Sequence, residues 1–405
     1  MAPSGAMVKV SLIRSFFVAS LVIAVGLAGS GLAAQRPQVP VLPEDGGALD
    51  AATSAVCNKQ VVLLGEAAHG NGHSDAFKAA MVARLIERCG FRAVLFEASF
   101  PQFVPIWRAQ RAGRSVTPDQ VGTAVGGLWK FDREFAPLLP YLAAQASEGL
   151  FLGGIDFQLG GLDQDFANAG MIAELSEGLG PLRAGACRRV VEARIYRDLD
   201  PEQRRQAHQC TAAIARRLAG TRGAIAAEQR MMLQSLTAFL DSVTIKGPGP
   251  YIAARDLAMF KNLQSLHSRL PRGTRLIIWT ANAHAAKDAQ GADGFSGVRN
   301  LGSYVVAAYG QRSYALGTTA LTGTQRWGRE IRPLPDMPAS SLEQIVIRPG
   351  EDASVFLDAA ALQQTGPKWS RLFGLKRAHA DWSEHFDGVV VFAEEHAAFS
   401  ARYGN

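Results

Sequence analysis

Four apolar stretches of strand-like composition each end on a side chain that is capable of acid–base chemistry. They are VVLLGEAAH (61–69), RAVLFE (92–97), LFLGGID (150–156) and RLIIWTANAH (275–284). The first is uniformly apolar at its start, which is typical of a strand buried on both faces of a parallel sheet. In an open α/β sheet, ligands bind beyond the carboxyl ends of the strands. We therefore expect one crevice to hold the side chains of Glu66, His69, Glu97, Asp156 and His284.

The residues between the first two stretches have helical periodicity. Asn71 or Ser74 can cap the start of this helix, and Gly90 is a typical helix stop. A strand–helix–strand unit with a right-handed crossover follows. The pattern predicts an α/β fold with a central, mostly parallel β-sheet flanked by helices. The apolar face of the predicted helix consists of Phe77, Met81, Leu85 and Ile86.

The pattern becomes helical and rich in charge over 163–270, where no clear strand is found. This indicates an inserted helical lobe between two parts of one catalytic α/β domain, at 49–162 and 271–405. Three prolines over 332–341 favour a loop near the rim of the site. Beyond the lobe we predict strands at 275–280, 304–309, 314–318, 355–357 and 388–392, the last of them at a sheet edge.

The N-terminus has the organisation of a secretory signal over residues 1–34. Lys9 and Arg14 precede an apolar run at 15–27, and small residues follow, with cleavage expected after Ala33 or Ala34. An uncleaved anchor is the alternative. The proline-rich segment 35–48 is typical of a linker, and no other long apolar segment is present. These features predict a periplasmic or secreted protein without a membrane span after cleavage.

The net charge of +6 includes Lys9 and Arg14, so the chain without its leader is only mildly basic. The arginines are scattered along helical segments at 183–205 and 216–230, which is typical of solvated helix faces. This distribution argues against nucleic-acid binding.

The four cysteines have no CxxC or metal-type spacing. In an exported protein an even number suggests two disulfides, for which three pairings exist. A strand–helix return could bring Cys57 to Cys89, while Cys187 and Cys210 flank a predicted helical hairpin. We therefore predict two local bonds, Cys57–Cys89 and Cys187–Cys210.

Hydrolysis by water needs a base that works near neutral pH and groups that stabilise negative charge. His69 follows Glu66 by three residues in a glycine-flanked turn, where the carboxylate could fix the tautomer of the imidazole. A lone histidine in a turn is more often structural, but the four companion groups at strand ends favour catalysis. Glu97 ends a buried strand and needs a partner, which Lys78 or His284 could supply.

Other roles compete for two further residues. His73 lies four residues after His69, as in a helical metal pair, but the glycines at 70 and 72 disfavour the regular turn that such a pair requires. Asp156 could cap the turn after its strand instead of serving catalysis. The chain contains no GxSxG, Walker, HExxH or GxGxxG motif, which argues against serine-triad, nucleotide-binding and zincin chemistry.

At these residues the chain resembles the erythromycin esterase family. The family's first motif, G-E-x-x-H-G, is present at 65–70, and Glu97 follows at the second strand end. The similarity runs in order from about residue 57 to beyond residue 321. The further similar motifs are WKFDREF (129–135), GIDFQ (154–158), RDLAM (255–259) followed by Asn262, and WTANAH (279–284).

The resemblance implies an ester or lactone hydrolase that uses histidine and carboxylates without a serine nucleophile. It implies that His69 is the general base, Glu66 its partner, and Glu97 and His284 further catalytic residues. No cofactor is expected, and the partner is a small-molecule ester or lactone. The residues expected to bind the substrate are Lys78, His73, Asp156, Glu134, Arg255 and Asn282.

The sequence departs from the macrolide-inactivating members at two positions. Lys78 occupies the place of an arginine, and His73 that of a glutamate. Lysine lacks the bidentate fork with which arginine grips a carboxylate. These departures argue against macrolide specificity, while hydrolysis and the antibiotic resistance that the resemblance implies remain expectations.

Two other functions remain open. One is a hydrolase that depends on a divalent metal held by the same cluster of side chains. The other is a non-catalytic binding or assembly protein related to cell-envelope polysaccharide. The ligands of the metal alternative would come from Glu66, His69, His73, Glu97 and His284.

Overall fold

A computed structural model of the chain describes residues 37–402, except 349 and 375. The predicted signal segment and the first two residues of the predicted linker lie outside the described residues. No helix within the described part is both long and apolar enough to cross a membrane.

The centre of the fold is an eight-stranded sheet with the order β3-β2-β4-β1-β5-β10-β7, to which β6 is added by pairing with β5. Neighbouring strands from β3 to β10 are parallel, whereas β7 and β6 are antiparallel to their partners. This architecture confirms the predicted α/β class. The strands are β1 (Val61–Glu66), β2 (Ala93–Ser99), β3 (Phe151–Asp156), β4 (Leu276–Ala281), β5 (Ser313–Trp327), β6 (Glu330–Pro333), β7 (Val355–Asp358) and β10 (Gly388–Glu395), and a separate pair is formed by β8 (Lys368–Ser370) and β9 (Ala378–Ala380).

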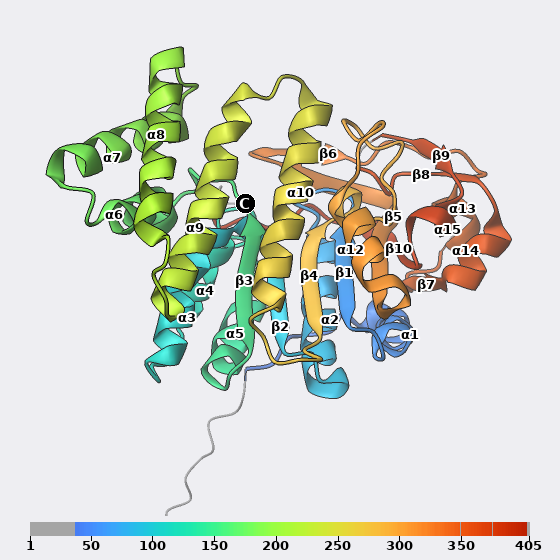
Figure 1. The fold of residues 1–405 in the computed structure, drawn as a ribbon. Helices are drawn as coiled ribbons and strands as arrows, with labels where there is room; N and C mark the ends of the chain where they lie inside the picture. The colour runs from blue at the N-terminus through green and yellow to red at the C-terminus, as the bar shows by residue number, and fades with distance from the viewer. Residues whose placement is uncertain (1–36, 349, 375, 403–405) are drawn as a thin grey trace, which may run out of the picture. The chain divides into compact units, whose positions relative to one another are not determined.

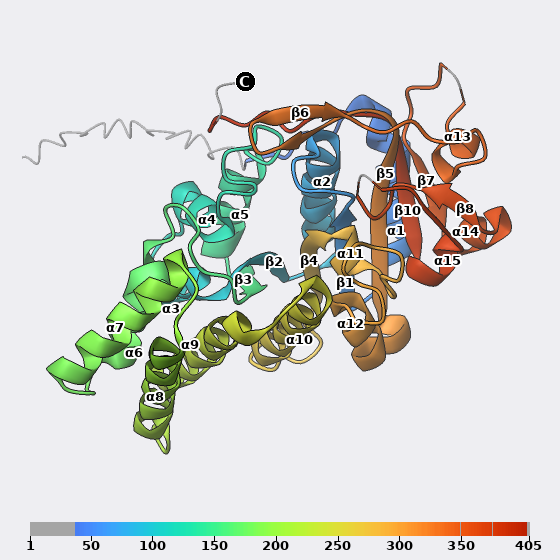
Figure 2. The same cartoon turned by 90° about the horizontal axis from the view of Figure 1, so that it is seen from above.

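Helices cover both faces of the sheet, and Figure 2 shows α2 and α5 on one face and α10 and α12 on the other. This double cover explains why β1 and β2 are buried along their whole length. The helices outside the lobe are α1 (Gly46–Val56), α2 (Gly72–Cys89), α3 (Val104–Arg111), α4 (Pro118–Val125), α5 (Leu138–Ser147), α11 (Asn282–Ala285), α12 (Leu301–Tyr309), α13 (Leu342–Val346), α14 (Ala359–Thr365) and α15 (Trp382–His385).

The helical lobe contains no strand in its described residues and projects to one side of the sheet in Figure 1. Its last helix returns to the sheet, where the Asn262 side chain donates a hydrogen bond to the carbonyl of Ile155 at 2.8 Å. The lobe is thereby attached to β3, whose end carries Asp156. Its helices are α6 (Met171–Ser176), α7 (Pro181–Tyr196), α8 (Pro201–Leu218), α9 (Ala224–Asp241) and α10 (Pro248–His267).

The first helix of the sheet unit follows the sequence pattern closely. Asn71 occupies the N-cap position of α2, and Gly90 ends the helix with a left-handed φ of 71°. Both predicted disulfides are confirmed, with Cα–Cα distances of 5.0 Å for Cys57–Cys89 and 5.4 Å for Cys187–Cys210. The first bond ties the end of α1 to the end of α2.

Three local expectations differ from the structure. The strand predicted at 304–309 was wrong, because this segment is helix α12, with Leu301 and Val305 buried on one face and the Asn300 side chain capping its start. A short apolar run does not by itself distinguish the periodicity of a helix from that of a strand. β10 lies between β5 and β7 rather than at an edge. Helix α1 begins at Gly46, within the segment interpreted as a linker.

Candidate active site

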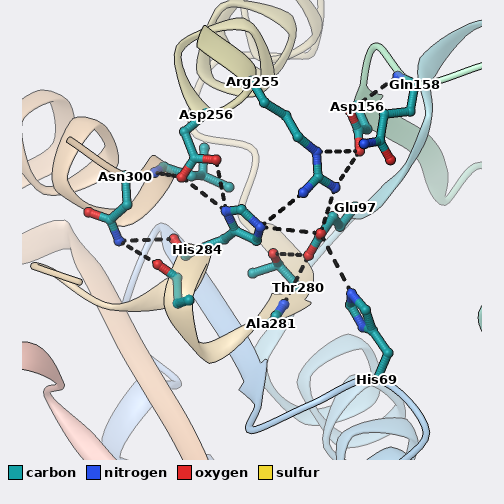
Figure 3. Close-up of polar contacts among 12 residues, drawn as sticks. His69, Glu97, Asp156, Gln158, Arg255, Asp256, Thr280, Ala281, His284 and Asn300 are labelled. Carbon is teal, nitrogen blue, oxygen red and sulfur yellow. Dashed lines mark hydrogen bonds and ion pairs between the residues drawn. The ribbon is translucent and has the colours of Figure 1, made fainter. Parts of the chain in front are cut away.

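The carboxyl ends of four adjacent strands place the predicted residues around one point. Glu66 ends β1, Glu97 lies near the end of β2, and Asp156 ends β3. The fourth strand, β4, is followed at once by α11, which carries His284. Figure 3 shows that side chains from these elements point toward Glu97.

His69 and Glu66 form the first histidine–carboxylate pair. The Nδ1 atom of His69 lies 2.8 Å from Oε1 of Glu66, and its Nε2 atom lies 3.8 Å from Oε1 of Glu97. The ring of Trp129 contacts the imidazole edge-on, with 5.5 Å between ring centroids. The His69 side chain is 31% exposed, whereas Glu66 is fully buried. A buried carboxylate therefore orients an imidazole that solvent can reach.

The turn that presents His69 requires glycine. Gly70 has a φ of +88°, and a Cβ atom at this position would lie 2.5 Å from the carbonyl oxygen of Arg326. The Gly70 carbonyl accepts hydrogen bonds from the backbone N–H groups of Arg326 and Ala398. The glycine that follows the motif histidine is thus needed for the close approach of β5 and the C-terminal segment.

A second histidine–carboxylate pair faces the first across Glu97. The Nδ1 atom of His284 lies 2.8 Å from Asp256 on α10, and its Nε2 atom lies 3.4 Å from Oε1 of Glu97. The backbone N–H of Leu301 donates to the same aspartate at 2.8 Å. Burial lowers the pKa of His284, but the Asp256 and Glu97 carboxylates outweigh it, so the pKa is raised. His284 is consequently held toward its charged form.

Glu97 is the common partner of both histidines. Its Oε1 atom accepts a hydrogen bond from Arg255 at 2.7 Å, and its Oε2 atom accepts from the Thr280 hydroxyl at 2.6 Å and the Ala281 N–H at 3.0 Å. Burial alone would raise the pKa of Glu97, but the charges of His284 and Arg255 bring it well below its usual range. Glu97 is an ionised, fully engaged carboxylate.

Arg255 joins the second and third strand ends. Its guanidinium donates to Oδ2 of Asp156 from Nε at 3.0 Å and from NH2 at 2.5 Å, in addition to its bond with Glu97. The other oxygen of Asp156 accepts from the backbone N–H of Gln158 at 3.2 Å. Asp156 therefore both caps its turn and binds Arg255, so the two roles considered for it coexist.

Lys78 lies beneath Glu66 and away from solvent. Its ammonium group forms an ion pair with Oε2 of Glu66, donates to the Thr280 carbonyl at 3.3 Å, and lies 4.1 Å from the ring centroid of Trp279. Burial brings the pKa of Lys78 well below its usual range, against the opposing effect of Glu97. The lysine thus supports Glu66 from behind.

His73 is turned away from this cluster. Its Nε2 atom lies 3.0 Å from Asp45, and its Nδ1 atom lies 2.8 Å from the backbone carbonyl of Glu394. Its ring stacks on Phe392. Burial lowers the pKa of His73, but Asp45 more than compensates, and the pKa is raised. The structure therefore places His73 in the contact between α2, α1 and β10, and not beside His69.

Two other residues predicted to bind the substrate are also engaged elsewhere. Glu134 lies 3.3 Å from His396 and accepts from the Phe399 N–H at 2.9 Å, which fixes the C-terminal segment. Asn282 is fully buried and donates to the carbonyls of Thr318 at 2.8 Å and Leu372 at 2.7 Å. Neither side chain is part of the cluster around Glu97.

A cavity of about 540 Å³ opens beside His69, between the turn after β1 and the loops that face it. A second cavity, of about 670 Å³, lies in the helical lobe between α8, α9 and α10 and is not lined by either histidine of the site. The first is the space from which a substrate can reach the accessible imidazole. Its lining residues are His69, Gly70, Gly127, Leu128, Asp132, Gly160, Gly161, Leu162, Arg326, Trp327, Gly328, Ser400 and Arg402.

The sequence profile described as erythromycin esterase matches residues 86–395, about three quarters of the chain. The chain belongs to the erythromycin esterase family. The match begins after the motif that contains Glu66 and His69, so their place in this family member's site comes from the geometry described above. No curated protein matches the chain in sequence.

Solved structures share this family member's fold at low sequence identity. A protein from Bacillus cereus is 16% identical, with a TM-score of 0.69 over 87% of this chain and 92% of its own. A succinoglycan biosynthesis protein is 14% identical, with a TM-score of 0.69 over 86% and 91%. A mutant of the erythromycin esterase EreC in its open conformation is 16% identical, with a TM-score of 0.60 over 87% and 95%.

Sequence reasoning missed Asp256 and Thr280 in this erythromycin esterase family member. Asp256 lies next to Arg255 on α10, and Asp256 is buried while Arg255 is partly buried in a helix that faces the sheet, so a pair of adjacent charges in an amphipathic helix was the available signal. Thr280 lies at the end of an apolar strand, where its hydroxyl reaches Glu97.

A buried acid beside His69 was also missed. Asp75 is fully buried, and neither of its carboxylate oxygens has a hydrogen-bond partner among the described residues. Burial and the neighbouring Asp132 raise the pKa of Asp75 well above its usual range. Burial likewise raises the pKa of Asp132 to about 7. Two carboxyl groups near His69, those of Asp75 and Asp132, are therefore harder to ionise than an exposed aspartate.

The carboxylates around Glu97 are matched to cations from the chain itself. Within the described residues, no three or more His, Cys, Asp or Glu side chains are grouped so that they could hold a metal ion. His73 was one of the five residues considered as metal ligands, but it lies beside Asp45 and not beside the other four. The arrangement supplies an oriented imidazole, a second imidazole held toward its charged form and a guanidinium, which together suit acid–base chemistry on a polarised bond.

Proposed function

We propose that the protein is an exported hydrolase that cleaves an ester or lactone, with His69 as the general base that activates water. The observation that carries this proposal is the exposure of His69, because it is the one member of the first pair that solvent can reach. Its Nδ1 atom is bound to Glu66, which leaves Nε2 to accept a proton.

In the proposed reaction, a water molecule near Nε2 of His69 gives up a proton to this atom while its oxygen bonds to the carbonyl carbon. The resulting tetrahedral intermediate then breaks the bond to the leaving oxygen, which takes the proton back from His69. The products are a carboxylic acid and an alcohol, or a hydroxy acid from a lactone. Glu66 stabilises the imidazolium between these two steps because its carboxylate lies 2.8 Å from Nδ1.

Negative charge that develops on the carbonyl oxygen needs a cationic partner. Arg255 and His284 contact Glu97 from the side opposite His69, as Figure 3 shows, and we assign them the role of offsetting the charge of Glu97 beside the carbonyl. Glu97 holds both of them, through the 2.7 Å bond from Arg255 and the 3.4 Å contact with His284. The buried carboxylate thus positions two cations rather than attacking the substrate.

Export is part of the same proposal. It is supported by the signal-like composition of residues 1–34, which the structure does not describe, and by the two disulfides of the described chain. Disulfides persist in oxidising compartments and are rare in reducing ones. Detection of the mature N-terminus near residue 34 or 35 in a periplasmic or secreted fraction would test this point.

The hydrolase proposal is tested by a screen of 4-nitrophenyl esters and lactones with the purified protein. We expect turnover of at least one substrate, reduced by roughly two orders of magnitude or more by His69→Ala and unaffected by chelator. Arg205→Ala, a surface arginine in the lobe, serves as the matched control and should keep full turnover. Turnover in His69→Ala above about a tenth of the wild-type value would remove His69 from the role of base.

A non-catalytic role related to cell-envelope polysaccharide is the second candidate. It is favoured by the fold shared with the succinoglycan biosynthesis protein, at a TM-score of 0.69. A protein that turns over no ester or lactone but binds an envelope polysaccharide would support this alternative.

A further inference from the structure

The cavity beside His69 is lined by several segments besides the turn that carries this histidine. Its wall combines five segments that are distant in sequence: the turn after β1, the loops at 127–132 and 160–162, the hairpin turn at 326–328 and the C-terminal residues 400–402. Because His69 is part of this wall, an ester whose carbonyl lies at Nε2 can place one of its two substituents in the cavity. The volume of about 540 Å³ is within the range of small-molecule sites.

Large apolar side chains stand exposed on this wall. Trp327 is 62% exposed, and Leu128 and Leu162 are each about half exposed. A single exposed apolar residue is ordinary, but several around one cavity mark a binding surface. The glycines of the same wall, such as Gly127 and Gly161, leave room between these side chains.

The backbone of Trp327 is held on the rim by strand pairing. It lies at the end of β5, paired with Glu330 of β6 across a turn that contains Gly328, whose φ is 59°. The neighbouring Arg326 is fixed to the catalytic turn, because its backbone N–H donates to the Gly70 carbonyl at 3.1 Å. In Figure 2 the β5–β6 hairpin extends from the sheet past α2 toward α5. The backbone that carries the indole is thus tied to the turn that presents His69.

The charged groups at the base of the wall interact with one another. Asp132 hydrogen-bonds with Ser400 and interacts electrostatically with Arg326, and burial raises the pKa of Asp132 to about 7. The Nε atom of Arg326 also donates to the Ala398 carbonyl at 2.6 Å. Asp132 and Arg326 partly offset each other, and the other charged lining residue, Arg402, is exposed to solvent. Burying an ionised guest against the apolar side chains of the wall would cost more than burying an uncharged one.

We propose that this cavity is the subsite for a neutral, apolar, ring-bearing substituent of the ester, and that Trp327 selects for it together with Leu128 and Leu162. The ring would stack on the indole while the scissile carbonyl lies at His69. This inference rests on the proposed hydrolase function.

The test compares three 4-nitrophenyl esters: the acetate, the 3-phenylpropanoate and the negatively charged hemisuccinate. For the wild type we expect kcat/KM to be highest for the phenylpropanoate. Trp327→Ala should reduce the ratio of phenylpropanoate to acetate by about fivefold to tenfold, the range for loss of one aromatic contact. Trp327→Phe should restore most of the ratio. Trp369→Ala, which removes an exposed tryptophan of β8 outside the cavity, is the matched control and should leave the ratio unchanged.

A second measurement separates the subsite from the hydrolase function. The ketone 4-phenylbutan-2-one has the same ring and carbonyl but no ester bond, and its binding is measured by calorimetry. Binding that weakens in Trp327→Ala but not in Trp369→Ala supports the subsite even if no ester is turned over. Ester turnover with an unchanged substrate ratio in Trp327→Ala, or a preference for the hemisuccinate, would overturn the subsite and leave the hydrolase proposal standing.

Discussion

The two histidine–carboxylate pairs of this protein face the same oxygen of Glu97 but differ in origin and exposure. Glu66 and His69 are three residues apart in one turn, whereas Asp256 and His284 come from α10 and α11 and are 28 residues apart. The His69 side chain is 31% exposed and that of His284 only 7%.

Because of this difference, we expect the two chemically similar pairs to have different roles in catalysis. An imidazole in contact with solvent can exchange a proton with water during each turnover. A buried imidazole between two carboxylates is held toward its charged form, because the charges of Asp256 and Glu97 outweigh the cost of burying the ring. We therefore expect the first pair to set the rate of proton transfer and the second to set the electrostatic field of the site.

The largest loss of turnover should come from changes to the Glu66–His69 pair. His69→Ala is expected to fold normally, because the side chain is partly exposed, and to lose turnover by roughly two orders of magnitude or more. Glu66→Gln should also impair turnover, and the double variant should be little worse than the worse single one, since the two residues act as a unit. Steady-state kinetics with circular dichroism as the folding control would measure this.

A His69→Ala protein that folds and keeps more than about a tenth of wild-type turnover would show that the Glu66–His69 pair does not carry out the proton transfer. His284 would then be the next candidate for the base. Lys59→Ala provides the control, since this lysine bonds a backbone carbonyl at the opposite end of the sheet.

The buried pair should give a smaller kinetic effect that depends on pH. His284→Gln removes a cation from the site, and we expect turnover to fall by about tenfold at neutral pH, within the range for loss of one electrostatic contact. Because the folded pKa of His284 is raised, the stability it contributes is full below its unfolded pKa and is lost as pH rises through the folded value. The wild type should therefore lose stability toward alkaline pH.

Urea unfolding of wild type and His284→Gln at several pH values measures this loss. The variant should be less stable than the wild type at pH 6, and the gap should narrow at higher pH. A gap that is constant over this range would show that His284 is not charged in the folded protein.

The acid beside the exposed pair should affect stability more than rate. The folded pKa of Asp132 is raised to about 7, so the folded protein binds this proton more tightly than the unfolded chain. The contribution of Asp132 to stability is then greatest at acid pH and falls as pH rises from about 4 to 7. In Asp132→Asn the fall in the free energy of unfolding between these pH values should be smaller by about 2 kcal/mol. One pKa unit corresponds to about 1.4 kcal/mol, and we expect roughly half of the full shift to be seen as stability.

The exposed Asp119 gives the matched control, since Asp119→Asn should leave the pH profile of the melting temperature unchanged. If Asp132→Asn also leaves it unchanged, the carboxyl group ionises normally. Asp75 would then be the buried acid to test.

The smallest effect is expected from chelation. Glu97 and Glu66 form ion pairs with Arg255 and Lys78, so treatment with chelator should leave turnover intact. Elemental analysis provides the second measurement. One transition metal per chain, with activity that is lost on its removal and restored on its return, would favour the metal-dependent alternative instead.

Much of the site could be predicted from the sequence because it depends on local order. Uniformly apolar stretches identify buried parallel strands, and the residues that end them are then expected at one sheet edge. Glu66, Glu97 and Asp156 follow from this rule, and His69 follows from its spacing to Glu66 in the same turn. The disulfide partners were likewise accessible, since each pair flanks one local unit.

The remaining decisions depended on which elements pack against each other, and no local pattern encodes that. His73 is only four residues from His69, yet β10 and α1 supply Glu394 and Asp45 as its partners, which turns it away from the site. Conversely, Asp256 reaches His284 because α10 returns from the lobe to cover the sheet. The sequence by itself determined the strands and the turn that present the acid–base groups. The tertiary structure alone decided which of these groups are buried, and burial with a specific partner determines whether a histidine is held charged or remains available to water.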